Sequence, residues 1–213
     1  MKTVLFDLDG TLGNTLPLCI AALREAIEPL TGRPLTDEQI KAGFGPSEEG
    51  TIRALLPENK AQAMHRFFER YEALHSRWPE PFAGVPELLQ YLKDRHVFLG
   101  LVTGKGPQST TITLTRYHLT DYFDVIKTGE PSGPVKDRRF EEILAEFSLA
   151  REEVLYVGDT SSDVAACRRC RIQIAAAAWA PTADIEALQS AHPDYLFTSI
   201  PPFFAFLKTR YGD

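Results

Sequence analysis

Two aspartates stand one residue apart at the end of an apolar run near the start of the sequence. Residues 4–6 are Val, Leu and Phe; Asp7, Leu8 and Asp9 follow, with Gly10 and Thr11 next. Strand side chains alternate with a period of two, so Asp7 and Asp9 leave the same side of the strand. Two carboxylates at a buried strand end suit Mg²⁺ and a carboxylate nucleophile. The alternative is a strand end at which the aspartates only cap a turn.

A second apolar run ends in the same way. Residues 154–157 are followed by Gly158 and Asp159, and Asp163 lies four positions further on. Ligands of open α/β sheets bind at the carboxyl ends of the strands, and we expect these carboxylates to meet Asp7 and Asp9 there.

A third apolar run, residues 97–102, ends in Thr103-Gly104-Lys105. A hydroxyl group and backbone N–H groups at a strand end suit a phosphate. A Thr-Gly pair alone indicates only a turn. The pair follows a strand, as the two acidic groups do, and this position is what indicates a ligand site.

The elements that must position these residues alternate along most of the chain. We predict strands at 3–8, 97–102, 124–127, 154–157 and 172–178, and helices at 85–95, 107–117, 138–147, 162–170 and 182–191. A short sixth strand at 195–197 and a closing helix at 202–208 complete the pattern. Such alternation predicts an α/β fold, a parallel sheet with helices on both faces.

Residues 14–80 interrupt this alternation with helices only. One apolar stripe spans residues 20–30, and another, rich in aromatic residues, spans 64–74. Thr36 and Gln39 form a capping box for a short helix, and Ser47 is expected to cap the next one. We therefore predict a small all-helical domain at 14–80 and an α/β domain made of 1–13 and 81–213.

These motifs resemble the haloacid dehalogenase superfamily, in its phosphoglycolate-phosphatase-like branch with a helical cap inserted after the first motif. The likeness runs over almost the whole chain. Residues 7–11 match the first motif, 103–105 the second, and Gly158-Asp159 with Asp163 the fourth. The resemblance implies a Rossmann-like sheet and a cap that excludes water and selects the substrate.

The resemblance also implies roles. Asp7 would attack phosphorus, and Asp9 would protonate the leaving oxygen and then activate water, while its main-chain carbonyl contacts the metal. Asp159 and Asp7 would hold Mg²⁺, and Asp163 would join them or orient the metal's waters. Thr103 and Gly104 would bind the phosphoryl group. The implied enzyme is a Mg²⁺-dependent phosphatase acting on a small phosphorylated metabolite, such as phosphoglycolate, through an aspartyl phosphate.

Two positions depart from the family pattern. The third motif is a lysine, commonly followed by proline, and Lys136 is instead followed by Asp137-Arg138-Arg139. We assign this role, neutralising nucleophile and phosphate, to Lys136, with Arg138 or Arg139 as substitutes and a solvated charge run as the alternative. Asn14 stands where relatives usually carry an aspartate, and it keeps a polar cap for the next helix.

Other functions remain open on the same motifs. An inorganic pyrophosphatase or a sugar-phosphate mutase shares this chemistry, and a non-catalytic phosphate-sensing domain would have only the altered third motif in its favour. A dehalogenase has no use for Asp9 or a metal. The candidate substrate-selecting residues are four: Asn14, Lys41, Phe44 and Arg53.

Composition excludes further classes. The 213 residues carry a net charge of −6, which argues against nucleic acid as a partner. No apolar stretch approaches the ~20 residues of a membrane span, and the early first strand leaves no room for a signal peptide, so we expect a cytoplasmic protein, a monomer or a homodimer. Cys167 and Cys170 have the spacing of half a zinc site without a second half. The scattered histidines are expected at the surface or at helix ends.

Overall fold

The computed structural model describes residues 1–56 and 58–212 and contains a parallel sheet of six strands. The spatial order is β3-β2-β1-β4-β5-β6, and each neighbouring pair is parallel. The strands are β1 (Thr3–Phe6), β2 (Phe98–Val102), β3 (Val125–Lys127), β4 (Val154–Gly158), β5 (Gln173–Ala177) and β6 (Tyr195–Phe197). All six lie where the sequence predicts them.

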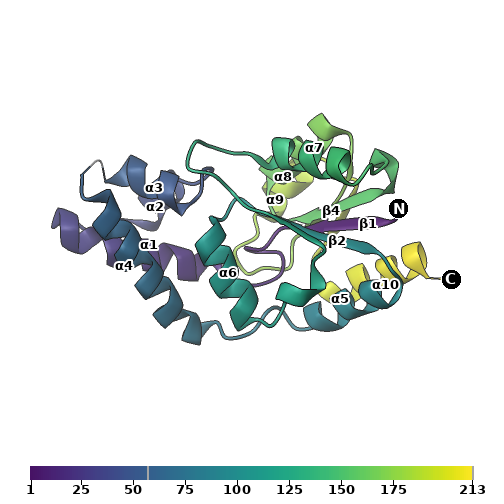
Figure 1. The fold of residues 1–213 in the computed structure, drawn as a ribbon, viewed down its shortest axis with the longest axis horizontal. Helices are drawn as coiled ribbons and strands as arrows, with labels where there is room; N and C mark the ends of the chain where they lie inside the picture. Colours follow the sequence, from purple (N-terminus) through teal and green to yellow (C-terminus); the bar gives the residue numbers. More distant parts are fainter. Residues whose placement is uncertain (57, 213) are drawn as a thin grey trace.

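Helices cover both faces of this sheet (Figure 1). On one face, α5 (Val85–Asp94) and α10 (Ile200–Tyr211) pack on apolar side chains that include Val4 and Phe6 of β1. On the other face, α7 (Lys136–Glu146), α8 (Ser161–Cys170) and α9 (Ile185–Ser190) enclose a second core that includes Leu5. Successive residues of β1 thus point into opposite cores, as expected for a strand buried on both faces. The predicted α/β fold class is confirmed.

The register of the central strands brings three chain segments together. Phe6, the last residue of β1, pairs with Leu101 of β2 and with Val157 of β4. Since the strands are parallel and adjacent, the residues that follow them emerge at the same edge of the sheet. Asp7, Thr103 and Asp159 therefore lie on neighbouring strand ends, although they are far apart in the sequence.

The remaining helices gather at this edge, at the left of Figure 1. They are α1 (Leu16–Thr31), α2 (Asp37–Lys41), α3 (Glu48–Leu55) and α4 (Lys60–Leu74), and they share an apolar core of their own. α6 (Pro107–Arg116) lies between them and the sheet, with Ile112 packed against the helical core. We propose residues 14–80 as a cap domain on this basis.

Short 3₁₀ helices occur at η1 (His75–Arg77), η2 (Thr120–Tyr122) and η3 (Arg151–Glu153). One histidine, His75 in η1, is fully buried, and it lies at the end of α4 as one of the two expected locations allows. Its Nε2 lies 3.2 Å from Thr113 Oγ1, and its ring packs edge-on against Tyr71 and Tyr117. Burial lowers the pKa of His75, which favours the neutral imidazole in this apolar setting. Tertiary packing between α4 and α6, invisible in the local sequence, encloses this residue.

The helix caps follow the sequence in part. Thr36 and Gln39 form the predicted capping box of α2. Ser47 does not cap α3 with its side chain, because its hydroxyl donates to the Glu49 carboxylate instead. Nor does Asn14 cap α1, which begins at Leu16 and whose N-cap residue is Thr15. Among the described residues, no helix is long and apolar enough to cross a membrane.

Candidate active site

Asp7 stands at the centre of the strand-end cluster and is almost fully buried, with 6% of its surface exposed. Its Oδ1 accepts a hydrogen bond of 2.7 Å from the backbone N–H of Leu8, and its Oδ2 one of 2.6 Å from Lys136 Nζ. Burial raises the pKa of Asp7 to about 6, against the lowering effect of the Lys136 charge. The carboxylate is fixed in position and poorly hydrated, as a nucleophile requires.

Asp159 and Asp163 complete an acidic triad with Asp7. One carboxylate oxygen of each residue lies within 4.8 Å of the others. Burial, together with the nearby charges of Asp7 and Asp163, raises the pKa of Asp159 well above its usual range. Three carboxylates held this close repel one another unless a cation lies among them.

Local structure fixes two members of the triad. Asp163 accepts from the hydroxyl and backbone N–H of Thr160 at 2.7 and 3.1 Å, the capping box that begins α8. Gly10, in the loop that follows β1, lies directly against Asp159. Its φ is +76°, and a Cβ there would overlap the Asp159 carboxylate. Only glycine allows both this conformation and this approach.

The donor set fits a hard divalent cation. Three carboxylates supply oxygen ligands only, which suits Mg²⁺ and not a soft thiol-binding metal. The triad is where the described residues offer the ligands for such a cation. The carboxylate of Asp9 is outside this triad.

Lys136 is the first residue of α7 and joins two members of the triad. Its Nζ donates to Asp7 at 2.6 Å and to Asp163 at 2.5 Å. Burial lowers the pKa of this ammonium, but the charges of Asp163 and Asp7 outweigh burial and raise the pKa above its usual value. Lys136 is therefore a permanent cation beside Asp7.

The two neighbouring arginines point elsewhere. Arg138 pairs with Glu130, with 53% of its side chain exposed, and Arg139 pairs with Glu130 and Glu142. Arg139 also donates to the Thr128 carbonyl at 3.0 Å. These contacts hold the loop before α7 and leave the strand-end cluster to Lys136.

Asp9 has different partners from Asp7. Its Oδ1 accepts from the Thr15 hydroxyl, and its Oδ2 from Lys105 Nζ at 3.3 Å. About a quarter of the Asp9 side chain, 27%, is exposed, and this side chain lines a cavity between the sheet edge and the helical layer. Both carboxylate oxygens are held by hydrogen bonds, and Asp9 lines the same cavity as Asp7.

Thr103 and Gly104 lie on the adjacent strand end. Thr103 is buried, and its Oγ1 accepts from the backbone N–H of Lys105 at 3.2 Å. The Gly104 backbone passes so close to Gly129 that a Cβ at position 129 would overlap its carbonyl. The loop that follows β2 is therefore packed tightly against the loop that follows β3.

The sequence does not predict a role for two residues of the site, Lys105 and Glu48. Lys105 belongs to the Thr-Gly-Lys motif, and its fully buried side chain contacts Asp9 and Glu48 at 3.3 and 3.2 Å. Glu48 begins α3 in the helical layer and is buried as well. In the sequence Glu48 reads as an ordinary acidic first-turn residue, and no local signal marks it for burial.

These groups line one cavity of about 530 Å³ between the sheet edge and the helical layer. Its polar floor includes Asp7, Asp9, Thr103, Lys136 and Asp159. Its walls are largely apolar: Leu16, Cys19, Phe44, Pro46, Pro134 and Val135. Of the four candidate substrate-selecting residues, Phe44 is on this wall; Asn14, Lys41 and Arg53 are not among the described lining residues.

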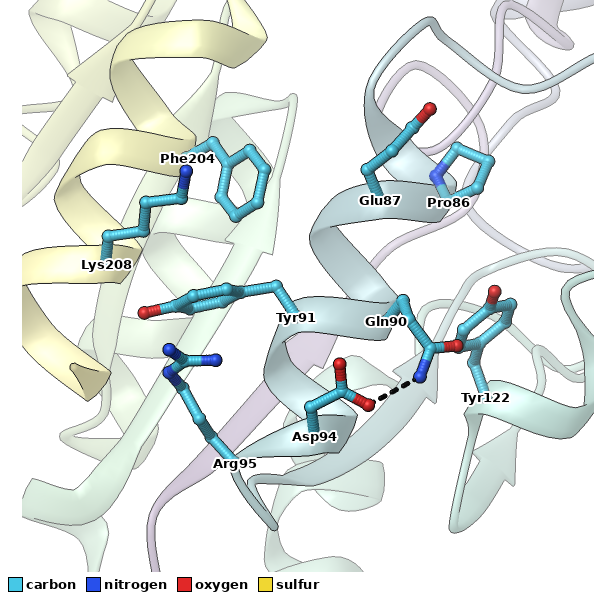
Figure 2. Close-up of a pocket in the computed structure, with 9 residues that line it drawn as sticks. All are labelled: Pro86, Glu87, Gln90, Tyr91, Asp94, Arg95, Tyr122, Phe204 and Lys208. Carbon is cyan, nitrogen blue, oxygen red and sulfur yellow. Dashed lines mark hydrogen bonds between the residues drawn. The ribbon is translucent and has the colours of Figure 1, made fainter. Parts of the chain in front are cut away.

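A larger, more open hollow of about 730 Å³ lies between α5 and α10, far from the acidic triad. Figure 2 shows Arg95 lying over the Tyr91 ring, 3.7 Å from its centroid, and Lys208 beside Phe204. Gln90 and Asp94 bond each other across one turn of α5. None of the residues that line this hollow belongs to the acidic triad, and we take the cavity over the triad as the candidate site.

A parallel sheet with an acidic triad, a buried lysine and a hydroxyl at its strand ends defines an enzyme for phosphoryl-group chemistry. Residues 4–177 match the haloacid dehalogenase-like hydrolase family, and the chain belongs to it. The family expected from the motifs is confirmed.

Individual relatives cover nearly the whole chain. Pyrophosphatase PpaX of Halalkalibacterium halodurans is 27% identical over 203 residues, with 94% of each chain covered. Phosphoglycolate phosphatase of Synechococcus elongatus is 30% identical over 200 residues, with 92% of each covered. The solved structure of a haloacid dehalogenase-like hydrolase from Streptococcus pneumoniae has a TM-score of 0.77 at 25% identity, covering 97% of this chain and 98% of its own.

Proposed function

We propose that this protein is a Mg²⁺-dependent phosphatase that hydrolyses a small phosphomonoester through an aspartyl-phosphate intermediate. The observation that carries the proposal is the setting of Asp7, a buried carboxylate 2.6 Å from a lysine and within 4.8 Å of two further carboxylates, at the floor of a cavity. Such a carboxylate can attack phosphorus once the surrounding negative charge is balanced.

In the first step, the Asp7 carboxylate forms a bond to phosphorus while the ester P–O bond breaks. The leaving oxygen takes a proton from Asp9, whose carboxyl group faces the cavity above Asp7. In the second step, Asp9 removes a proton from water, which attacks phosphorus and releases Asp7 and inorganic phosphate. Splitting one displacement into two lowers each barrier, and Asp9 is left protonated for the next cycle.

The other site residues bind and balance charge. Lys136 faces the growing charge on the transferring group, and Thr103 with the Gly104 backbone would bind phosphoryl oxygens. Asp7, Asp159 and Asp163, with the Asp9 carbonyl, would hold Mg²⁺, which when bound neutralises the triad and polarises the phosphoryl group.

The cavity supports a small substrate. It is closed on one side by α1 and α3, through Leu16, Cys19 and Thr51, so a phosphorylated protein surface could not reach Asp7 in this conformation. A phosphorylated acid or sugar of a few carbons fits its volume. The relative named as a phosphoglycolate phosphatase supports phosphoglycolate as such a substrate, and the one named as a pyrophosphatase supports pyrophosphate as the alternative.

A turnover screen tests the proposal. Phosphoglycolate, short phosphorylated acids and sugars, β-glucose 1-phosphate and pyrophosphate are each incubated with enzyme in Mg²⁺ and after chelation, and inorganic phosphate is measured. We expect phosphate release from at least one phosphomonoester, lost on chelation. Release from pyrophosphate alone would identify a pyrophosphatase, and isomerisation without release a mutase. No reaction with any of these substrates would contradict the proposed phosphatase activity.

A further inference from the structure

A carboxylate of the cap is buried in the α/β domain at the beginning of α6. Glu48 Oε2 accepts a hydrogen bond of 2.7 Å from the backbone N–H of Gly106, and Oε1 accepts one of 2.6 Å from the Ser109 hydroxyl. Lys105 Nζ lies 3.2 Å from the same Oε1. Three donors of one domain thus converge on a single anion supplied by the other.

Lys105 connects this carboxylate to the catalytic loop. Its fully buried ammonium lies between Glu48 and Asp9, 3.2 and 3.3 Å from their oxygens, and 4.5 Å from the centroid of the Tyr71 ring on α4. Burial alone disfavours the charged amine, but the two carboxylates outweigh it, so the ammonium persists. A buried cation between two carboxylates restricts where each carboxylate can lie.

The space at the start of α6 is shaped for the Glu48 side chain. Gly106 has φ of −68° and ψ of 162°, a conformation open to any residue, so its backbone does not require glycine. A Cβ at position 106 would instead lie 2.7 Å from Glu48 Oε2 and 2.9 Å from Glu49 Oε2. The absent side chain is what lets the carboxylate reach the helix N-terminus.

We propose that Glu48 and Lys105 form a latch that couples closure of the cap to the orientation of Asp9. When α3 is seated, Glu48 completes the surroundings of Lys105, and Lys105 holds Asp9 Oδ2 while Thr15 holds Oδ1. Lys105 and Glu48 are positioning residues: they act on the reaction through Asp9. This inference rests on the proposed role of Asp9 as acid and base.

The latch explains why closure and chemistry would occur together. With the cap open, Glu48 leaves, and water can solvate Lys105, which no longer needs to stay near Asp9. With the cap closed, removing either charge leaves a buried partner without its counter-charge. Asp9 is then correctly aimed only over a cavity from which the cap has excluded bulk water.

Two aryl phosphates of different leaving-group quality separate this role from a structural one. Phenyl phosphate needs a proton on its leaving oxygen, whereas 4-nitrophenyl phosphate does not. We expect Lys105→Met to lower kcat/KM for phenyl phosphate by about 10²-fold and for 4-nitrophenyl phosphate by less than about tenfold. Because hydrolysis of the phosphoenzyme still needs Asp9, rapid mixing should show a burst of nitrophenolate.

Variants at the cap side complete the test. Glu48→Gln removes the charge, and Gly106→Ala displaces the carboxylate. Both variants should lose more kcat/KM for phenyl phosphate than for 4-nitrophenyl phosphate, with smaller losses than Lys105→Met. Because the residues act as a unit, the double variant Lys105→Met with Glu48→Gln should be no slower than Lys105→Met alone. Glu49→Gln is the matched control on the same helix, since its carboxylate bonds Ser47 and not Lys105.

The outcomes separate the two proposals. Equal losses on both aryl phosphates, additive effects of the two substitutions, or unchanged activity in all three single variants would overturn the latch. If Lys105→Met fails to fold, as circular dichroism would show, Glu48→Gln and Gly106→Ala decide alone. Failure of the proposed function appears differently, as a native protein that turns over neither aryl phosphate and forms no phosphoenzyme.

Discussion

Lys136 Nζ lies 2.6 Å from Asp7 Oδ2, although the two residues are 129 positions apart in the chain. The same ammonium reaches Asp163 at 2.5 Å, so one cation joins the strand end of β1 to the first turn of α8. The lysine reduces the repulsion within the acidic triad before any metal binds. It also lies where negative charge would grow on a phosphoryl group attached to Asp7.

Replacing Lys136 should therefore impair the chemical step. We expect Lys136→Ala to lower kcat by about 10²-fold or more at saturating Mg²⁺, because the transition state loses a preorganised charge. Steady-state kinetics on the best substrate of the screen measures the loss.

Arg138→Ala and Arg139→Ala are the matched controls for Lys136. Their guanidinium groups pair with Glu130 and Glu142, so we expect losses below about tenfold. A severe loss at either arginine with a mild one at Lys136 would show that the third motif is assigned to the wrong residue.

Asp7→Asn should abolish covalent catalysis while keeping the shape of the side chain. We expect turnover of any phosphomonoester to fall by about 10³-fold or more. Trapping the native enzyme with beryllium trifluoride and Mg²⁺ should modify Asp7 alone, as ¹⁹F spectra and the loss of the signal in the variant would show. Near-full activity of Asp7→Asn would exclude the aspartyl phosphate.

Asp159→Ala should weaken metal binding. Asp159 contributes one of the three carboxylates of the triad, so its removal should raise the Mg²⁺ concentration for half-maximal activity by about tenfold or more, or abolish activity. Titrating Mg²⁺ into native and variant enzyme measures this. The double variant Cys167→Ser with Cys170→Ser is the control, and we expect no change in its Mg²⁺ requirement. Activity of the native enzyme that survives chelation would contradict a metal requirement.

The binding of Mg²⁺ should depend on pH through Asp7. Burial raises the pKa of Asp7 to about 6 in the metal-free protein, so a proton occupies the carboxylate below that pH and must leave before a metal binds. We expect the apparent affinity for Mg²⁺ to fall by about tenfold or more per pH unit below pH 6, measured by calorimetric titration, because the pKa of Asp159 in the same triad is raised as well. Asp7→Asn should have a weaker dependence, and an affinity independent of pH in the native protein would contradict the raised pKa.

The same shift has a consequence for stability. Between the ordinary pKa of an aspartate, 3.8, and about 6, folded Asp7 binds more protons than unfolded Asp7. Its contribution to the free energy of unfolding of the metal-free protein is therefore largest at low pH and is lost as the pH rises through this window.

Most of the fold could be read from the sequence. The strand runs 97–102 and 154–157 are continuous stretches of apolar residues bounded by glycine and polar residues, and that pattern depends only on local spacing. The observed β2 and β4 agree with them within a residue. Asp7, Thr103 and Asp159 were found for the same reason, because each directly follows such a run and parallel strands bring their ends together.

The environment of those residues could not be read in the same way. His75 looks like a polar helix-end residue, and only the packing of α4 on α6 buries it. Glu48 looks like an exposed first-turn acid, and only the seating of α3 on α6 places it against Lys105. Burial of this kind depends on which elements meet, not on the residues beside the side chain in the chain.

The sequence by itself indicated the order of the motifs along the chain, the kind of chemistry and a candidate nucleophile, because these follow from residue type and period. The tertiary structure alone decided that Lys136, and not Arg138 or Arg139, reaches Asp7, since three cations within four positions leave the helix in different directions. It also decided that α3 places the Glu48 carboxylate beside Lys105. Contacts between elements far apart in the sequence depend on how two surfaces fit, and that fit is a property of the folded chain.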